Sequence, residues 1–189
     1  NSGGPDRWGR LLPTTAFPGA AIDGGRALVG FAAGDQCGEL RNLDEIVREE
    51  QAILTSLNAP AFPSYDVMAI ADPFVIVGDQ ADNRAFIYRR AGASNWVLEI
   101  ELEPSRPAPS WFGFSVDIEG DLAVVGDPRD DSLEGAVYVY RRGTSGWEEV
   151  AVFESRVSAE RGWSVAISGD RVFAGAPRQG GVDGGAVFI

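Results

Sequence analysis

The segment from Asp127 to Glu134 contains the densest group of side chains that could do chemistry in this sequence, Asp-Pro-Arg-Asp-Asp-Ser-Leu-Glu. Its carboxylates permit a low-affinity cation site held by Asp127, Asp130 and Asp131, or a carboxylate pair for glycoside hydrolysis. The third possibility is a solvated loop, because Asp is common in turns. We favour the solvated loop, since residues 178–183, at the corresponding place later in the chain, have hardly any metal-binding side chains.

Charged side chains in this loop are also the first place where we expect a partner to bind. A rigid scaffold that carries variable loops is well suited to binding. The expected partner-binding residues are Asp127, Arg129, Asp130, Asp131 and Glu134, together with Arg178 from the corresponding later loop.

Several kinds of catalytic and metal site are excluded within this chain by its composition. It contains no histidine, so a Ser–His–Asp or Cys–His site and a histidine-ligated zinc site are impossible. Cys37 is the single cysteine, which excludes an intrachain disulfide and a thiolate cluster. We therefore predict no catalytic residue, no metal site beyond the weak cation candidate above, no cofactor, and a protein that is not an enzyme.

The overall composition narrows the class of partner. The 189 residues include 28 acidic and 16 basic side chains, giving a formal net charge of −12. Binding to nucleic acid depends on clustered Lys and Arg that neutralise phosphates, so a nucleic-acid partner is not expected. No apolar run approaches the roughly 18 residues that a membrane-spanning helix needs.

The elements that must position these residues repeat along the chain. Each of four similar segments contains an isoleucine, then a turn, then a hydrophobic run that ends with a glycine. The glycines are separated by 48, 48 and 49 residues, and the isoleucines by the same steps. The glycines are Gly30, Gly78, Gly126 and Gly175, and the isoleucines are Ile22, Ile70, Ile118 and Ile167. A fixed period in this range indicates a repeat architecture.

Alternating apolar and polar residues predict strands in each repeat. The clearest are Arg84–Arg90, Trp96–Leu102, Leu122–Gly126 and Ala136–Arg141, and we expect the first strand of the third repeat to cover Phe112–Ile118. Residues 39–57 are ambiguous, because their apolar residues lie near helical spacing while their position in the repeat corresponds to two strands. We favour two degenerate strands, because the period of 48 is kept across them.

Tryptophans recur at two positions of the repeat, Trp96 with Trp147 and Trp111 with Trp163. Their recurrence indicates packing between repeats rather than stacking on a sugar. Two arginine pairs, Arg89–Arg90 and Arg141–Arg142, end the third strand of their repeats, and we expect them to pair with nearby Glu side chains.

The repeat resembles the FG-GAP family, which builds the propellers of integrin α-subunits and many bacterial surface proteins. The motifs that carry the resemblance are Phe112–Gly113 with Ser115–Val116, Gly126–Asp127–Pro128, Gly175–Ala176–Pro177, Gly135–Ala136–Val137–Tyr138 and Gly185–Ala186–Val187–Phe188. The resemblance implies an all-β fold, a β-propeller of four-stranded antiparallel blades. We expect a single domain over residues 1–189 with about four repeats, approximately 17–57, 65–104, 112–155 and 163–189. The last repeat ends in the middle of a blade, so the chain can be part of a larger ring.

The resemblance also implies a function. We expect a non-enzymatic binding or adhesion module, extracellular, at the cell surface or periplasmic, that presents propeller loops to a protein or glycan. The alternatives are a structural subunit of a larger assembly and, more weakly, a carboxylate-dependent glycoside hydrolase. Integrin-type repeats bind calcium in an Asp-rich loop, but here that interval is a tight turn such as Glu119–Gly120–Asp121. One or two carboxylates do not supply the six to eight oxygens that Ca²⁺ takes, so we expect no calcium site of that type.

Overall fold

A computed structural model describes residues 67–92, 95–106, 111–130, 134–154, 159–178 and 185–188, and the backbone of four strands between residues 20 and 55. The described residues form antiparallel sheets in which each strand pairs with the next one along the chain. The first sheet contains β1 (Ala20–Asp23), β2 (Arg26–Val29), β3 (Gln36–Asn42) and β4 (Glu50–Thr55). The second contains β5 (Val67–Ala71), β6 (Phe74–Asp79), β7 (Arg84–Arg90) and β8 (Trp96–Leu102).

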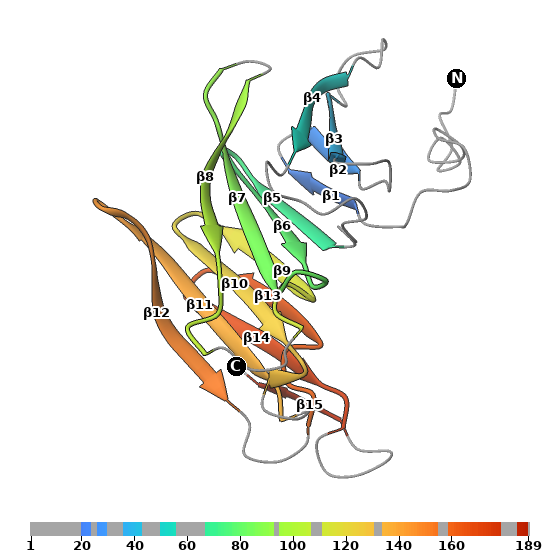
Figure 1. Cartoon of the computed structure of the whole chain (residues 1–189), viewed down its shortest axis with the longest axis vertical. Coiled ribbons are helices and arrows are strands. Elements are labelled where there is room, and N and C mark those ends of the chain that lie inside the picture. Colours follow the sequence, from blue (N-terminus) through green and yellow to red (C-terminus); the bar gives the residue numbers. More distant parts are fainter. Residues whose placement is uncertain are drawn as a thin grey trace, which may run out of the picture.

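The third sheet contains β9 (Ser115–Glu119), β10 (Leu122–Asp127), β11 (Ala136–Gly143) and β12 (Gly146–Glu154). The fourth contains β13 (Ser164–Ser168), β14 (Arg171–Ala176) and β15 (Ala186–Phe188). Figure 1 shows the sheets following one another in chain order, from blue and teal to red. Their first strands β1, β5, β9 and β13 lie side by side, as they do around the axis of a propeller. The described sheets do not close into a ring.

These sheets confirm the predicted all-β propeller architecture. Strands β7 and β8 begin and end at the predicted residues. Of the ambiguous residues 39–57, residues 39–42 belong to β3 and residues 50–55 to β4, and the two strands pair with each other from Gln36 opposite Thr55 to Arg41 opposite Glu50. Repeat position therefore predicts their structure correctly, whereas the local helical spacing of their apolar residues does not.

The predicted ends of β10 and β11 are one and two residues short, and the largest error in a strand boundary is at the start of β9. The first strand of the third sheet begins at Ser115, not at Phe112. The reason is Gly113, whose φ of 93° is incompatible with a strand and turns the chain before β9. Gly162, with φ of 89°, makes the same turn before β13.

The middle sheet is covered on both faces. In β10, Ala123 and Val125 pack in the seam with the second sheet, and Val124, between them, packs in the seam with the fourth. Phe112, from the turn before β9, is fully buried in the first of these seams, with its ring 5.1 Å from that of Tyr138. Alternate residues of one strand thus face two neighbouring sheets, which explains why the inner strands are almost wholly apolar.

Glycines set the spacing between neighbouring sheets. A Cβ on Gly126 of β10 would overlap the carbonyl oxygen of Gly162 in the next sheet, and a Cβ on Gly78 would overlap that of Gly113. The hydroxyl of Ser115 donates a hydrogen bond of 2.8 Å to the same carbonyl of Gly162. The glycine turn of each of these later sheets is therefore inserted against the sheet before it.

Polar contacts join the sheets nearer the rim. The Glu99 carboxylate accepts from Arg89 Nε of its own sheet at 2.6 Å, and from Arg142 Nε at 2.7 Å and Trp147 Nε1 at 3.1 Å of the third sheet. Burial raises the pKa of Glu99, but the hydrogen bonds and positive charges of Arg142 and Arg89 outweigh it, so the pKa lies below its usual value. The expected pairing of Arg89 and Arg142 with a Glu is confirmed, and Arg90 pairs with Asp72 instead.

Trp147 also confirms the expected packing between repeats. Its side chain is 5% exposed and meets the Phe74 ring of the second sheet edge-on, at 5.4 Å. In the part of the chain that the structure describes, no helix is long and apolar enough to cross a membrane.

Candidate partner-binding face

The predicted partner-binding residues lie at one end of the sheets, which we call the connector face. In the third sheet Ser115 pairs with Gly126, so the turn before β9 and the loop after β10 lie at the same end. In the fourth sheet Ser164 pairs with Gly175 in the same way. The tight turns at residues 120–121 and 169–170 lie at the opposite end. The connector face therefore comprises residues 111–114, 127–130, 134–135, 159–163 and 177–178.

The carboxylate of Asp127 is buried and holds this face together. The residue is fully buried, and its Oδ1 accepts hydrogen bonds from the backbone N–H of Trp111 at 2.8 Å and of Arg129 at 3.2 Å. Asp127 thereby ties the segment before β9 to the loop after β10. The expectation of a solvated carboxylate is wrong at this position, because the fold buries Asp127 against a backbone donor sixteen residues away in the sequence, the N–H of Trp111.

Asp130 is buried as well, at 2% exposed. Its Oδ2 accepts from Arg106 Nη1 and from the Tyr138 hydroxyl, both at 3.2 Å. Burial raises the pKa of the Tyr138 phenol far above its usual value, and the negative charges of Asp130 and Asp127 raise it further. The phenol consequently remains a neutral donor to Asp130, and the expectation of a solvated carboxylate fails here too.

The other predicted residues of this loop are placed differently. Arg129 is exposed, and Glu134 is half-buried, with its carbonyl oxygen accepting from the Arg161 N–H at 3.4 Å. Arg178 forms an ion pair with Glu160, 3.1 Å between Nη1 and Oε1, and its side chain is 61% exposed. Asp131 lies outside the described residues. The described members of the predicted set are thus brought to one face, but two of the carboxylates point inward.

An aromatic cluster lies on the same face. The ring of Trp111 stacks on that of Phe114, with centroids 5.7 Å apart and planes 9° apart. Phe114 in turn meets Trp163 of the fourth sheet at 4.9 Å and 52°. The Arg129 guanidinium lies over the Trp111 ring, 3.5 Å from its centroid, in a cation–π contact. We call Trp111, Phe114, Trp163 and Arg129 the aromatic cluster.

Sequence reasoning found the members of the aromatic cluster only in part. The recurrence of Trp111 and Trp163 correctly indicated packing across repeats, since Phe114 links them between two sheets. It gave no sign that Trp163 would remain 43% exposed, or that Arg129 would cover Trp111. The turn at Gly113 places residues 111–114 on the connector face, and this turn could not be recognised from the alternating pattern of the sequence.

The arrangement favours recognition over chemistry. Among the described residues there is no group of three or more His, Cys, Asp or Glu side chains placed to hold a metal ion. Asp127 and Asp130 are enclosed by donors of the protein, so neither offers an exposed carboxylate to a sugar. What the face offers to another molecule is an exposed indole beside an arginine.

Comparison with known proteins agrees with this architecture. Residues 96–140, from β8 to β11, match the sequence model of the FG-GAP repeat. The resemblance of this chain to the FG-GAP family is confirmed. An FG-GAP propeller repeat supports a role in protein interaction in general.

Among solved structures, the chain is similar to the Saccharomyces cerevisiae protein Sqt1, a propeller-like protein, with a TM-score of 0.51 and 12% sequence identity. The similarity covers 74% of this chain and 35% of Sqt1, so the chain spans about a third of that protein. At this identity the similarity shows the fold and nothing of the partner. No curated protein matches the sequence.

Proposed function

We propose that this chain is a non-enzymatic binding module, extracellular or at the cell surface, that presents its connector face to a partner protein. The observation that carries the proposal is the aromatic cluster, in which an exposed Trp163 lies beside a Trp111–Phe114 stack covered by Arg129. Tryptophan and arginine are enriched among the few residues that dominate binding energy at protein interfaces.

The cluster is held in place before any partner arrives. Buried Asp127 fixes the backbone at both Trp111 and Arg129, the two residues in cation–π contact. A surface that is already ordered loses less conformational entropy on binding, which favours affinity. The buried carboxylates thus support binding by holding the exposed residues.

The same geometry makes a protein a better partner than a glycan. Stacking on a sugar needs a free ring face, but Arg129 covers one face of Trp111 and Phe114 stacks on the ring as well. Trp163 supplies the remaining exposed indole, 43% of which is accessible. A single exposed ring and an arginine suit the anchor of a protein interface, at which one tryptophan contributes about 2 kcal/mol or more.

Binding without catalysis agrees with the carboxylates that the structure describes. FG-GAP repeats and propeller neighbours are typically non-enzymatic. A carboxylate pair for hydrolysis was considered in the loop Asp127–Glu134, and two acids of this loop, Asp127 and Asp130, are 0% and 2% exposed. A structural subunit is the second candidate, favoured by Val150 and Phe153 of β12, which are 53% and 50% exposed at the rim.

A three-way capture experiment tests the proposal. Immobilised wild type, Trp163→Ala and Phe153→Ala are incubated with surface extracts of the source cells, and bound proteins are quantified by mass spectrometry. We expect a partner that Phe153→Ala retains and that Trp163→Ala binds at least about tenfold more weakly, a loss of about 1.4 kcal/mol. Equal capture by all three chains contradicts the proposal.

Two further outcomes of this experiment are informative. Loss of the partner with Phe153→Ala but not with Trp163→Ala supports the structural subunit. If no protein is captured and the chain binds a glycan array in a way that depends on Trp163, the partner is a glycan and not a protein. The melting temperatures of the variants show that each remains folded.

A further inference from the structure

We infer that the partner presents an Asp or Glu carboxylate to Arg129, so that the connector face recognises an acidic segment of another protein. The inference rests on the proposed function, because it names the chemistry of the partner that binds this face. Its basis is the separation of charge on the connector face, where the exposed charged side chains are arginines and the acids are buried or half-buried.

The described acids of the connector face are withdrawn from solvent. Asp127, Asp130 and Glu160 are 0%, 2% and 7% exposed, and Glu134 is half-buried. The chain as a whole has the opposite balance, with 28 acidic and 16 basic side chains. The exposed charges of this face are therefore positive on a protein that is otherwise acidic, and such a face attracts a negatively charged partner.

Arg129 is held at the surface with its hydrogen-bond donors available. Its guanidinium lies 3.5 Å from the centroid of the Trp111 ring. Among the residues that the structure describes, no carboxylate pairs with Arg129. The rim arginines Arg89 and Arg142 differ, because both pair with Glu99. A cation–π contact positions a guanidinium but does not use its N–H donors, which leaves them to bind an acceptor from a partner.

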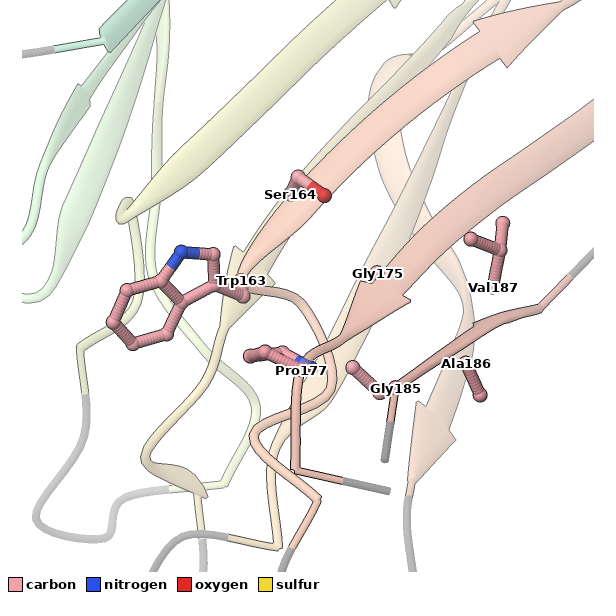
Figure 2. A pocket seen from close by; sticks show the side chains of 8 residues that line it. Trp163, Ser164, Gly175, Pro177, Gly185, Ala186 and Val187 are labelled. Carbon is pink, nitrogen blue, oxygen red and sulfur yellow. The ribbon is translucent and has the colours of Figure 1, made fainter. Parts of the chain in front are cut away.

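The fourth sheet carries an arginine at the same position of the repeat. Arg129 follows Pro128, and Arg178 follows Pro177. Pro177 and Trp163 line one groove and lie close together in Figure 2, so Arg178 comes directly after a residue that neighbours the aromatic cluster. The Arg178 side chain is 61% exposed. The aromatic cluster thus has an exposed arginine in each of the two sheets that build it.

The position of Arg129 within the propeller is what carries the inference. Arg129 follows β10 of the third sheet, which has a neighbouring sheet packed on both faces, and it is still exposed. In the second sheet the corresponding residue is Ala81, and that sheet forms the same four strands. An arginine is therefore not required here by the fold, which favours a role in binding.

A protein carboxylate suits this face better than a nucleic acid or another dense polyanion. A polyanion is bound by clustered Lys and Arg, and the net charge of −12 on this chain repels it. A guanidinium binds a single carboxylate through two parallel N–H···O bonds. The rings of Trp111 and Phe114 lie beside Arg129 and offer apolar contact to the neighbouring side chains of the partner. We expect an acidic residue flanked by apolar residues.

Selection of peptides tests this inference before the partner is identified. Random peptides displayed on phage are selected on immobilised wild type, Arg129→Gln and Arg141→Gln. Arg141 is the matched control, because it is exposed and pairs with Leu122 beside the opposite turn at residues 120–121. We expect Asp and Glu to be at least about twice as frequent in the peptides selected on wild type and on Arg141→Gln as in the unselected library, with no enrichment on Arg129→Gln.

A titration then isolates the contact with Arg129. The most enriched peptide and a copy with Asn and Gln in place of its Asp and Glu are titrated into wild type, Arg129→Gln and Arg129→Lys. Removing the acids should weaken binding to wild type at least about tenfold, and binding to Arg129→Gln less than about twofold. Arg129→Lys should lie between them, because lysine keeps the charge and loses the planar fork. Melting temperatures show that each variant remains folded.

Several results overturn the inference. They are the selection of no peptide on wild type, enrichment of peptides without acids, and an equal loss of both peptides with Arg129→Gln, which would mean that Arg129 only supports the structure. Binding of heparin that depends on Arg129, without acidic peptides, would assign the arginine to a polyanion.

These failures differ from a failure of the proposed function. A captured partner that depends on Trp163 but is bound equally by wild type and Arg129→Gln keeps the proposed function and overturns the acidic segment. Acidic peptides that depend on Arg129, without any captured protein, support the contact with the carboxylate and contradict the proposed function.

Discussion

Replacing Glu99 by alanine should weaken the seam between the second and third sheets. The Glu99 side chain is 16% exposed, and its carboxylate is shared by Arg89, Arg142 and the indole N–H of Trp147. A hydrogen bond to a charged group contributes about 1.5–3 kcal/mol when it is shielded from water. The two arginine side chains are 41% and 36% exposed, so solvent screening reduces each ion pair to about 0.5–1 kcal/mol.

Trp147 adds to this cost because its side chain is only 5% exposed. Removing the acceptor leaves a buried N–H without this hydrogen bond, which costs about 1 kcal/mol or more. Glu99→Ala should therefore lower the free energy of unfolding by about 2–3 kcal/mol, which lowers the melting temperature by about 5–10 °C in a chain of this size. Glu99→Gln keeps an acceptor oxygen for the indole and should lose about half as much.

Thermal unfolding followed by circular dichroism measures these differences. The matched control is Glu103→Ala, because Glu103 is 66% exposed and its carboxylate reaches Arg84 only at 3.8 Å. We expect the control to lie within about 2 °C of wild type, as is usual for an exposed ion pair. A Glu99→Ala protein that melts within 1–2 °C of wild type would refute the reasoning.

Three further predictions concern the seams and the expectation that no calcium is bound. Gly126→Ala should lower the free energy of unfolding by about 3 kcal/mol or more in chemical denaturation, because its Cβ overlaps the Gly162 carbonyl, whereas Gly143→Ala should change it by less than about 1 kcal/mol. Burial raises the pKa of Asp117 above its usual value of 3.8, even though its carboxylate accepts hydrogen bonds from the backbone N–H of Ile167 and Ile118. The ionised carboxylate is therefore less stable in the folded chain than in the unfolded chain. Its contribution to stability falls as pH rises from 3.8 to the raised pKa. The melting temperature of Asp117→Asn minus that of the wild type should therefore increase from pH 4 to pH 7. A difference that does not change with pH refutes this prediction. EDTA should leave the melting temperature of the wild type unchanged, and a fall of several degrees would show that a bound divalent cation stabilises the fold.

The contribution of Glu99 itself should show the opposite pH dependence. Its pKa is lowered in the folded chain, so its contribution is complete above pH 4.5 and is lost as pH falls through the lowered pKa. The difference in melting temperature between wild type and Glu99→Gln should therefore shrink on acidification. A difference that grows at low pH contradicts the assignment of the three donors to this carboxylate.

The sequence predicted the strands well where repeat and pattern agree. Arg84–Arg90 and Trp96–Leu102 alternate clearly and lie at fixed repeat positions, and both strands have the predicted bounds. Residues 39–57 show that repeat position is the stronger of the two signals, because β3 and β4 form despite helical spacing. The start of β9 was missed because the φ of Gly113 is a property of the packed seam and not of the local pattern.

The sequence predicted which loop lies on the connector face, but not which of its side chains are exposed there. The loop after β10 does lie on the connector face, yet Asp127 and Asp130 are buried by partners as distant as Trp111 and Arg106. Acidic residues in a turn-rich segment are ordinarily exposed, so composition alone favoured the wrong environment. The contact between Arg129 and Trp111 depends on two loops meeting at one end of a sheet, which requires the fold to be known.

Hydrogen–deuterium exchange with the captured partner tests the central claim most directly. Amides at residues 111–114, 127–130 and 159–163 should exchange more slowly in the complex, while those of the opposite turns at residues 120–121 and 169–170 should not change. The same experiment with Trp163→Ala should show no slowing at an equal partner concentration. Protection confined to the opposite turns, or to the exposed rim of β12, would contradict binding through the connector face.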